Sequence, residues 1–112
     1  MSSQIPEPDW RQFKQVHQTL LERFCAGVLK ELSAITTDPN GTPHERYLRA
    51  YKLLHKRDKE LGRSFDDFRR STAVMQLSVM RRMGLLTDEE LSRFSAETQN
   101  TIRAFESISR DR

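Results

Sequence analysis

The sequence has few of the residues that most often form crosslinks or carry chemistry. Cys25 is the only cysteine among 112 residues, and the four glycines are all isolated from one another. A single cysteine excludes an intrachain disulfide and any multi-cysteine metal site. Isolated glycines exclude a glycine-rich loop that would cradle phosphate groups. We therefore interpret Cys25 as a small buried hydrophobic residue and expect no cofactor.

Long hydrophobic runs are also missing. No stretch approaches the roughly 18 apolar residues that a membrane span requires. The residues from Met1 to Pro8 lack the apolar segment of a secretory signal. The sequence thus predicts a cytoplasmic protein with no membrane contact.

The charge balance is close to even, with 19 basic and 16 acidic residues and a net charge of +3. Proteins dedicated to nucleic-acid binding usually carry a larger and more clustered excess. A hydrophobic fraction of 36% predicts a folded chain with a modest core, which leaves a homodimer open. We expect a flexible segment over 1–8, a single helical domain over 9–109 and a polar tail over 110–112.

Helical periodicity covers most of the chain. Apolar residues recur at steps of three and four from Trp10 to Ile35, which predicts a helix over 10–36 with Asp9 as its N-cap. A Pro-Asn-Gly turn follows. Thr42 and Glu45 form a capping box that opens a second helix, and Gly62 is expected to close it.

The remaining segments also read as helices. Ser64 is expected to cap a third helix that ends at Gly84, with Met75, Leu77 and Met80 interpreted as core. The Thr87-x-x-Glu90 capping box predicts a short helix over 88–94, and a last helix follows over 96–109. Short connections favour antiparallel neighbours, so the predicted fold is all-α, a four- to five-helix antiparallel bundle.

No group of side chains has the spacing of a catalytic or metal site. His44 and His55 are eleven residues apart on one helix, about 16 Å along its axis and too far for one metal ion. His17 lies on an apolar face and is interpreted as a residue at the edge of the core. Asp66 and Asp67 suit the positive end of a helix dipole. We expect no metal site and no enzyme.

The strongest candidate for a functional surface is the charged face of the second helix. Its basic residues fall in one arc and comprise Arg46, Arg49, Lys52, Lys56, Arg57 and Lys59. Tyr47, Tyr51, Leu54 and Leu61 lie opposite and are predicted to face the core. Leu53 projects from the charged side. A merely solvated face is the simpler interpretation; the functional one is a contact patch centred on Leu53 with Arg49, Lys52, Lys56 and Arg57.

The sequence therefore favours a small helical protein–protein interaction or regulatory module with no catalytic site. The alternative is a nucleic-acid-associated protein that binds phosphates through the basic face of the second helix.

Overall fold

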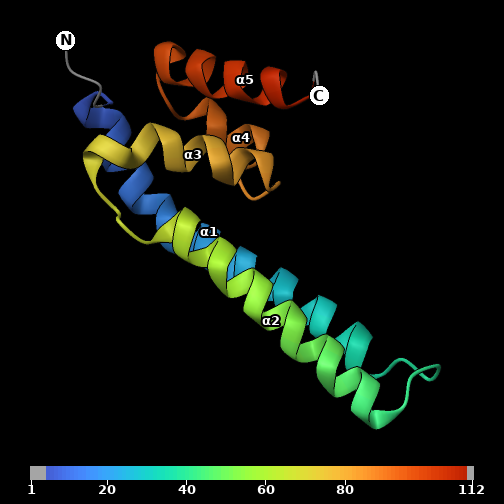
Figure 1. Cartoon of the computed structure of the whole chain (residues 1–112). Helices are drawn as coiled ribbons and strands as arrows, with labels where there is room; N and C mark the ends of the chain where they lie inside the picture. The colour runs from blue at the N-terminus through green and yellow to red at the C-terminus, as the bar shows by residue number, and fades with distance from the viewer. Residues whose placement is uncertain (1–4, 111–112) are drawn as a thin grey trace. The chain divides into compact units, whose positions relative to one another are not determined.

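A computed structural model describes residues 5–110. Five α-helices and one short 3-10 turn account for nearly all of this part of the chain, which contains no strand. The helices are α1 (Glu7–Thr36), α2 (Pro43–Phe65), α3 (Ala73–Arg82), α4 (Asp88–Ser92) and α5 (Ala96–Arg110), with the 3-10 turn at Arg70–Thr72 (Figure 1). The predicted all-α fold is confirmed.

The chain divides into two compact units. The first combines the residues up to Leu21 with those from Asp67 onward, and the second spans Glu22–Asp66. Helix α1 contributes its first half to one unit and its second half to the other. The single domain expected over 9–109 stays a prediction, and each unit is described by itself.

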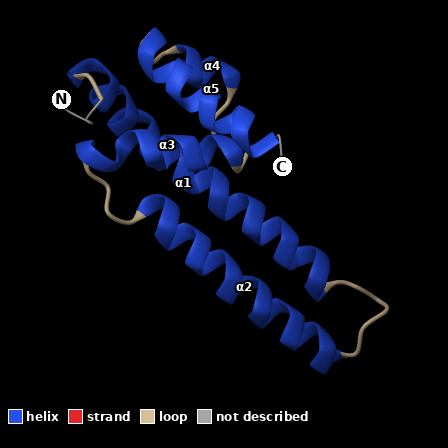
Figure 2. Cartoon of the chain, turned by 45° about the horizontal axis from the view of Figure 1, so that its top comes forward, coloured by secondary structure: helices blue, strands red, loops and turns tan. Residues whose placement is uncertain are grey.

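The first unit holds most of the buried apolar side chains. Helix α3 packs against α5, and the short α4 joins them (Figure 2). The apolar core consists of Ile5, Phe13, Val16, Leu20, Ala73, Leu77, Met80, Leu85, Leu86, Leu91, Phe94 and Ile102. Leu77 and Met80 are fully buried as predicted, whereas the expectation for Met75 is wrong because its side chain is 66% exposed.

The start of α1 differs from the prediction. The helix begins at Glu7, within the segment expected to be flexible, and Ile5 just before it is buried. Pro8 is accommodated because it lies in the first turn, where its missing N–H would have no intrahelical partner. Residues 1–4 and 111–112, which belong to the expected flexible segment and tail, lie outside the described residues.

Asp9 caps a different helix from the one expected. Its carboxylate lies inside the first turn of α1 and is 3% exposed. It accepts hydrogen bonds from the Ser95 N–H at 2.8 Å, the Ser95 hydroxyl at 2.6 Å and the Thr98 hydroxyl at 2.6 Å. Ser95 and Thr98 flank the start of α5, so Asp9 holds the N-terminus of α5 against α1.

The two predicted capping boxes are both present. In α2, Glu45 N–H donates to the Thr42 hydroxyl at 3.1 Å and Thr42 N–H donates to the Glu45 carboxylate at 2.9 Å. Thr87 and Glu90 make the same reciprocal pair at the start of α4. Both capping boxes are confirmed. The sequence could identify them because each depends only on residues three positions apart.

The boundary between the second and third helices is wrong in the prediction. Helix α2 continues past Gly62 to Phe65, and Ser64 is a buried residue of α2 rather than a cap. Continuing the helix brings Phe65 against Phe24, with ring centroids 6.0 Å apart. The chain turns at Asp67 instead, which has a left-handed backbone with φ of 58°.

His17 lies in an aromatic cluster of the first unit. Its imidazole stacks on Phe68 with ring centroids 3.8 Å apart, and Phe13 meets it edge-on. Burial lowers the pKa of His17 below its ordinary value of about 6.5. The position agrees with the predicted role at the edge of the core.

This environment predicts a pH dependence of stability. Because the folded chain binds the His17 proton less readily than the unfolded chain, stability that is present above about pH 6.5 is lost as the pH falls through the lowered pKa. We expect the free energy of unfolding, measured in urea, to decrease between pH 7 and pH 5. His17→Gln should flatten the curve in this window; an unchanged slope in that variant would contradict the assignment.

Candidate docking surface on helix α2

The second unit is a helical hairpin. The second half of α1 and all of α2 run antiparallel, joined by residues 37–42, which contain the predicted Pro-Asn-Gly turn (Figures 1 and 2). Two hydrogen bonds stabilise the turn. The Arg46 guanidinium of α2 donates to the Thr36 carbonyl at the end of α1 at 2.9 Å, and the Asn40 N–H donates to the Asp38 carboxylate within the turn at 3.0 Å. The hairpin thus has a defined tip.

Helix α2 carries two neighbouring seams, each with alternating steps of four and three residues. The inner seam consists of Arg46, Ala50, Leu53, Arg57, Glu60 and Ser64. The outer seam consists of Tyr47, Tyr51, Leu54, Asp58, Leu61 and Phe65. Every inner-seam residue is half-buried or buried, whereas Tyr47 is 67%, Tyr51 62% and Leu54 44% exposed. The helix therefore buries its more polar seam and exposes much of its more apolar one.

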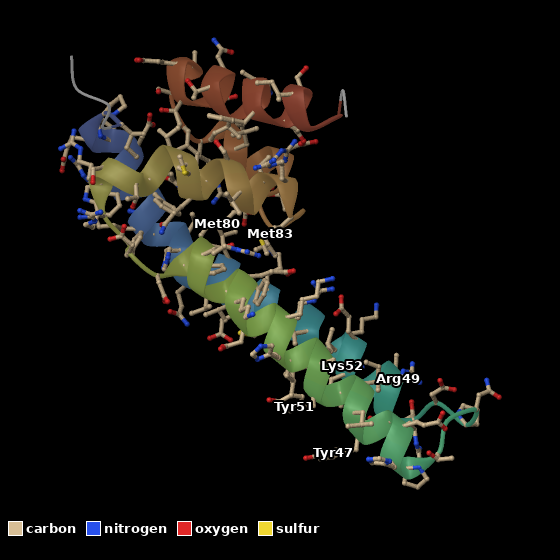
Figure 3. The ribbon with its side chains drawn as sticks, viewed as in Figure 1. Tyr47, Arg49, Tyr51, Lys52, Met80 and Met83 are labelled. Atoms are coloured by element: carbon tan, nitrogen blue, oxygen red, sulfur yellow. The ribbon has the colours of Figure 1, made fainter. Side chains whose placement is uncertain are left out.

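Figure 3 shows Tyr47 and Tyr51 projecting from the same side of α2. The expectation that Tyr47, Tyr51 and Leu54 face the core is wrong, and so is the expectation that Leu53 projects from the charged side. Leu53 is half-buried.

Ion pairs accompany this rotation of α2. The Arg57 guanidinium donates to both Glu31 oxygens at 3.0 Å and also to Glu60 at 2.8 Å. Near the tip, Arg49 pairs with Asp38 at 2.9 Å. Because these pairs join α2 to α1 or to the turn, they favour the orientation that places Arg57 toward α1.

The same contacts change the pKa values of the paired groups. Hydrogen bonding to Glu31 raises the pKa of Arg57. The Asn40 N–H and then the Arg49 side chain lower the pKa of Asp38. Both pairs are charged at neutral pH, so the charges of Arg49 and Arg57 are already matched within the hairpin.

Four further cations of α2 line a basic groove, together with Glu60. Lys52, Lys56, Lys59 and Arg63 are exposed, and within the described part of the chain none of them has an ion-pair partner. Tyr51 and His55 line the same groove, with ring planes 6° apart and centroids 6.1 Å apart. The groove thus combines unmatched positive charge with two accessible aromatic faces.

An apolar groove runs between the helices beside the outer seam. Cys25, Val28 and Leu29 of α1 face Leu54 and Leu61 of α2 across a volume of about 210 Å³. Leu29 is 62% exposed. Pockets for small-molecule ligands usually measure about 300–1,000 Å³. This groove is smaller and suits an apolar side chain of a partner.

The five residues predicted as a contact patch are therefore divided between different roles. Lys52 and Lys56 are exposed and line the basic groove, Arg49 and Arg57 are engaged in ion pairs, and Leu53 lies in the inner seam. The sequence interpretation missed the exposed apolar residues Tyr47, Tyr51, Leu54 and Leu29. For the three residues of α2, the signal was the second four-three repeat, which lay within the single apolar arc assigned to that helix.

Across residues 5–110, no three His, Cys, Asp or Glu side chains gather to hold a metal ion. None of the helices described is long and apolar enough to cross a membrane. No protein-family model matches the sequence, and no curated protein or solved structure shows significant similarity to it.

Proposed function

We propose that this chain is a protein–protein interaction module that docks its partner on the outer seam of α2, rather than an enzyme. The observation that carries the proposal is the exposure of Tyr47, Tyr51 and Leu54 on one face of a hairpin. A cytoplasmic location, expected from the sequence, belongs to the same proposal.

The composition of the seam supports this function. Contiguous exposed apolar patches mark interaction sites more often than isolated exposed residues do. Tyrosine is enriched among residues that dominate binding energy because it combines a large apolar ring with a polar hydroxyl. Leu29 of α1 extends the patch across the apolar groove. Unmatched lysines at its edge provide a polar rim.

Site-specific photo-crosslinking tests the function. A photoreactive phenylalanine analogue at position 51 should form a discrete protein adduct in cells that express the full chain. The matched control places the analogue at Met75, which is equally exposed but belongs to the other unit. Adducts at 51 and none at 75 support a docking seam. No protein adduct at 51, or equal adducts at both positions, would contradict it.

The basic groove favours one second candidate, association with nucleic acid. Lys52, Lys56, Lys59 and Arg63 could contact phosphates while Tyr51 stacks on a base. With four phosphate contacts, the logarithm of the affinity for single-stranded DNA should fall against the logarithm of salt concentration with a slope of about −2.8. Filter binding of random-sequence DNA at 50 and 200 mM salt measures this slope. No retention at low salt removes this candidate.

A further inference from the structure

Resting on the proposed function, we infer that the partner supplies an acidic amphipathic α-helix, which lies along the outer seam and the apolar groove and completes a three-helix unit with the hairpin. The spacing, charge and depth of the surface indicate the chemistry of the partner. Each of these features points to one property of the docked segment.

The spacing of the seam points to a helix. Alternating steps of four and three residues present side chains in the pattern that a helix fills by knobs-into-holes packing. Tyr47, Tyr51 and Leu54 extend this pattern over two turns of exposed surface. An amphipathic helix anchored at i, i+3 or i+4, and i+7 matches such a row.

The groove supplies the depth that an anchor side chain needs. Its wall contains Leu29 and Cys25 on one side and Leu54 and Leu61 on the other. A leucine or phenylalanine of the docked helix would enter there. Burying such a side chain contributes about 1.5–3 kcal/mol.

Charge decides which kind of helix fits. At 100° per residue, His55 borders the outer seam on the side away from α1, and Lys59 and Lys52 lie beyond it in the groove that they share with Tyr51. The two lysines have no ion-pair partner among the described residues. Because Arg57 is already matched by Glu31 and Glu60, the unmatched positive charge of α2 lies in the basic groove that begins at Tyr51. A helix with glutamate or aspartate on its facing flank complements it.

The same charges disfavour a second copy of this chain as the occupant. Antiparallel self-pairing of the exposed seam would be centred near residue 56, where Tyr51 meets Leu61 and Leu54 meets Asp58 of the other copy. That arrangement brings the unmatched lysines of both copies near one interface. Like charges at such distances oppose association.

Asp58 adds a requirement for the partner. It occupies a seam position between Leu54 and Leu61 and is exposed. A single polar residue within an apolar seam fixes register by demanding a matching polar group. The docked helix should therefore carry one lysine, arginine or asparagine in the layer that faces Asp58.

The test uses a labelled synthetic helix of about three heptads with leucine at its seam positions, glutamate at its flanks and one lysine opposite Asp58. Its basic twin has lysine in place of each glutamate. Fluorescence anisotropy with the full chain at 50 mM salt should show the acidic peptide binding at least about 10-fold more tightly than the twin. Lys52→Glu with Lys59→Glu should remove or reverse this preference. Lys30→Glu, an exposed residue of α1 in the same unit, should leave it unchanged.

The outcomes separate the inference from the proposed function. Equal binding of the two peptides, or a preference that survives the Lys52 and Lys59 reversal, would overturn the acidic-helix inference even if position 51 still crosslinks to a protein. A concentration-dependent dimer in sedimentation that Tyr51→Glu abolishes would assign the seam to a second copy instead. Tight salt-sensitive binding of DNA with no peptide binding would assign it to nucleic acid.

Discussion

Replacing Asp9 with alanine should lower the free energy of unfolding by about 3 kcal/mol, because one buried and two partly buried donors at the start of α5 lose their acceptor. The Ser95 hydroxyl and the Thr98 hydroxyl would also be left in a site where the carboxylate is only 3% exposed. Urea unfolding followed by circular dichroism measures the change.

Two further variants give this prediction its controls. Asp9→Asn keeps one acceptor oxygen, so its loss should be smaller than that of alanine. Asp58→Ala removes an exposed carboxylate and should stay within about 0.5 kcal/mol of the parent. If Asp9→Ala were as mild as Asp58→Ala, the capping of α5 by α1 would contribute no stability.

The second large effect concerns the outer seam. Tyr51→Glu combined with Leu54→Glu should weaken binding of the acidic peptide by about 100-fold or more, since anchor residues each contribute about 2 kcal/mol or more. The same double variant should lose far less stability than affinity, because Tyr51 is 62% and Leu54 44% exposed. Anisotropy and urea unfolding provide the two readouts.

Matched substitutions show whether that loss is specific. Met75→Glu places the same charge at an equally exposed apolar residue outside the hairpin and should leave peptide affinity unchanged. Leu53→Glu, by contrast, should destabilise the hairpin because Leu53 belongs to the half-buried inner seam. Full peptide binding by the Tyr51 and Leu54 double variant would refute docking on the outer seam.

Local signals in the sequence predicted where several of the helices begin. Thr42 with Glu45 and Thr87 with Glu90 form their capping boxes, because the partners are only three residues apart and need no tertiary support. Gly62 carried an equally familiar signal for a helix end. There the packing of Phe65 against Phe24 outweighs the local preference and extends α2 by another turn.

Contacts between distant residues could not be predicted in the same way. Asp9 has the sequence signature of an N-cap for its own helix, yet its hydrogen-bond partners are Ser95 and Thr98 near the other end of the chain. Nothing in the residues around Asp9 specifies that pairing, which exists only once α1 and α5 are side by side.

The rotation of α2 was the most consequential feature that the sequence left undetermined. Two seams one residue apart both have the four-three spacing, and the hydrophobic arc favoured burial of the outer one. In the structure the inner seam faces α1, and Arg57 reaches Glu31 across the hairpin. This ion pair joins residues that are 26 positions apart, so the spacing of apolar residues along one helix could not predict it.

Maleimide labelling of single cysteines tests the orientation of α2 most directly. In a Cys25→Ser background, cysteine is placed one position at a time at Tyr47 and Tyr51 of the outer seam and at Ala50 and Leu53 of the inner seam. The outer positions should react at rates close to those of a free thiol and the inner positions markedly more slowly. Faster reaction at 50 and 53 than at 47 and 51 would contradict the account, since the apolar seam would then face α1.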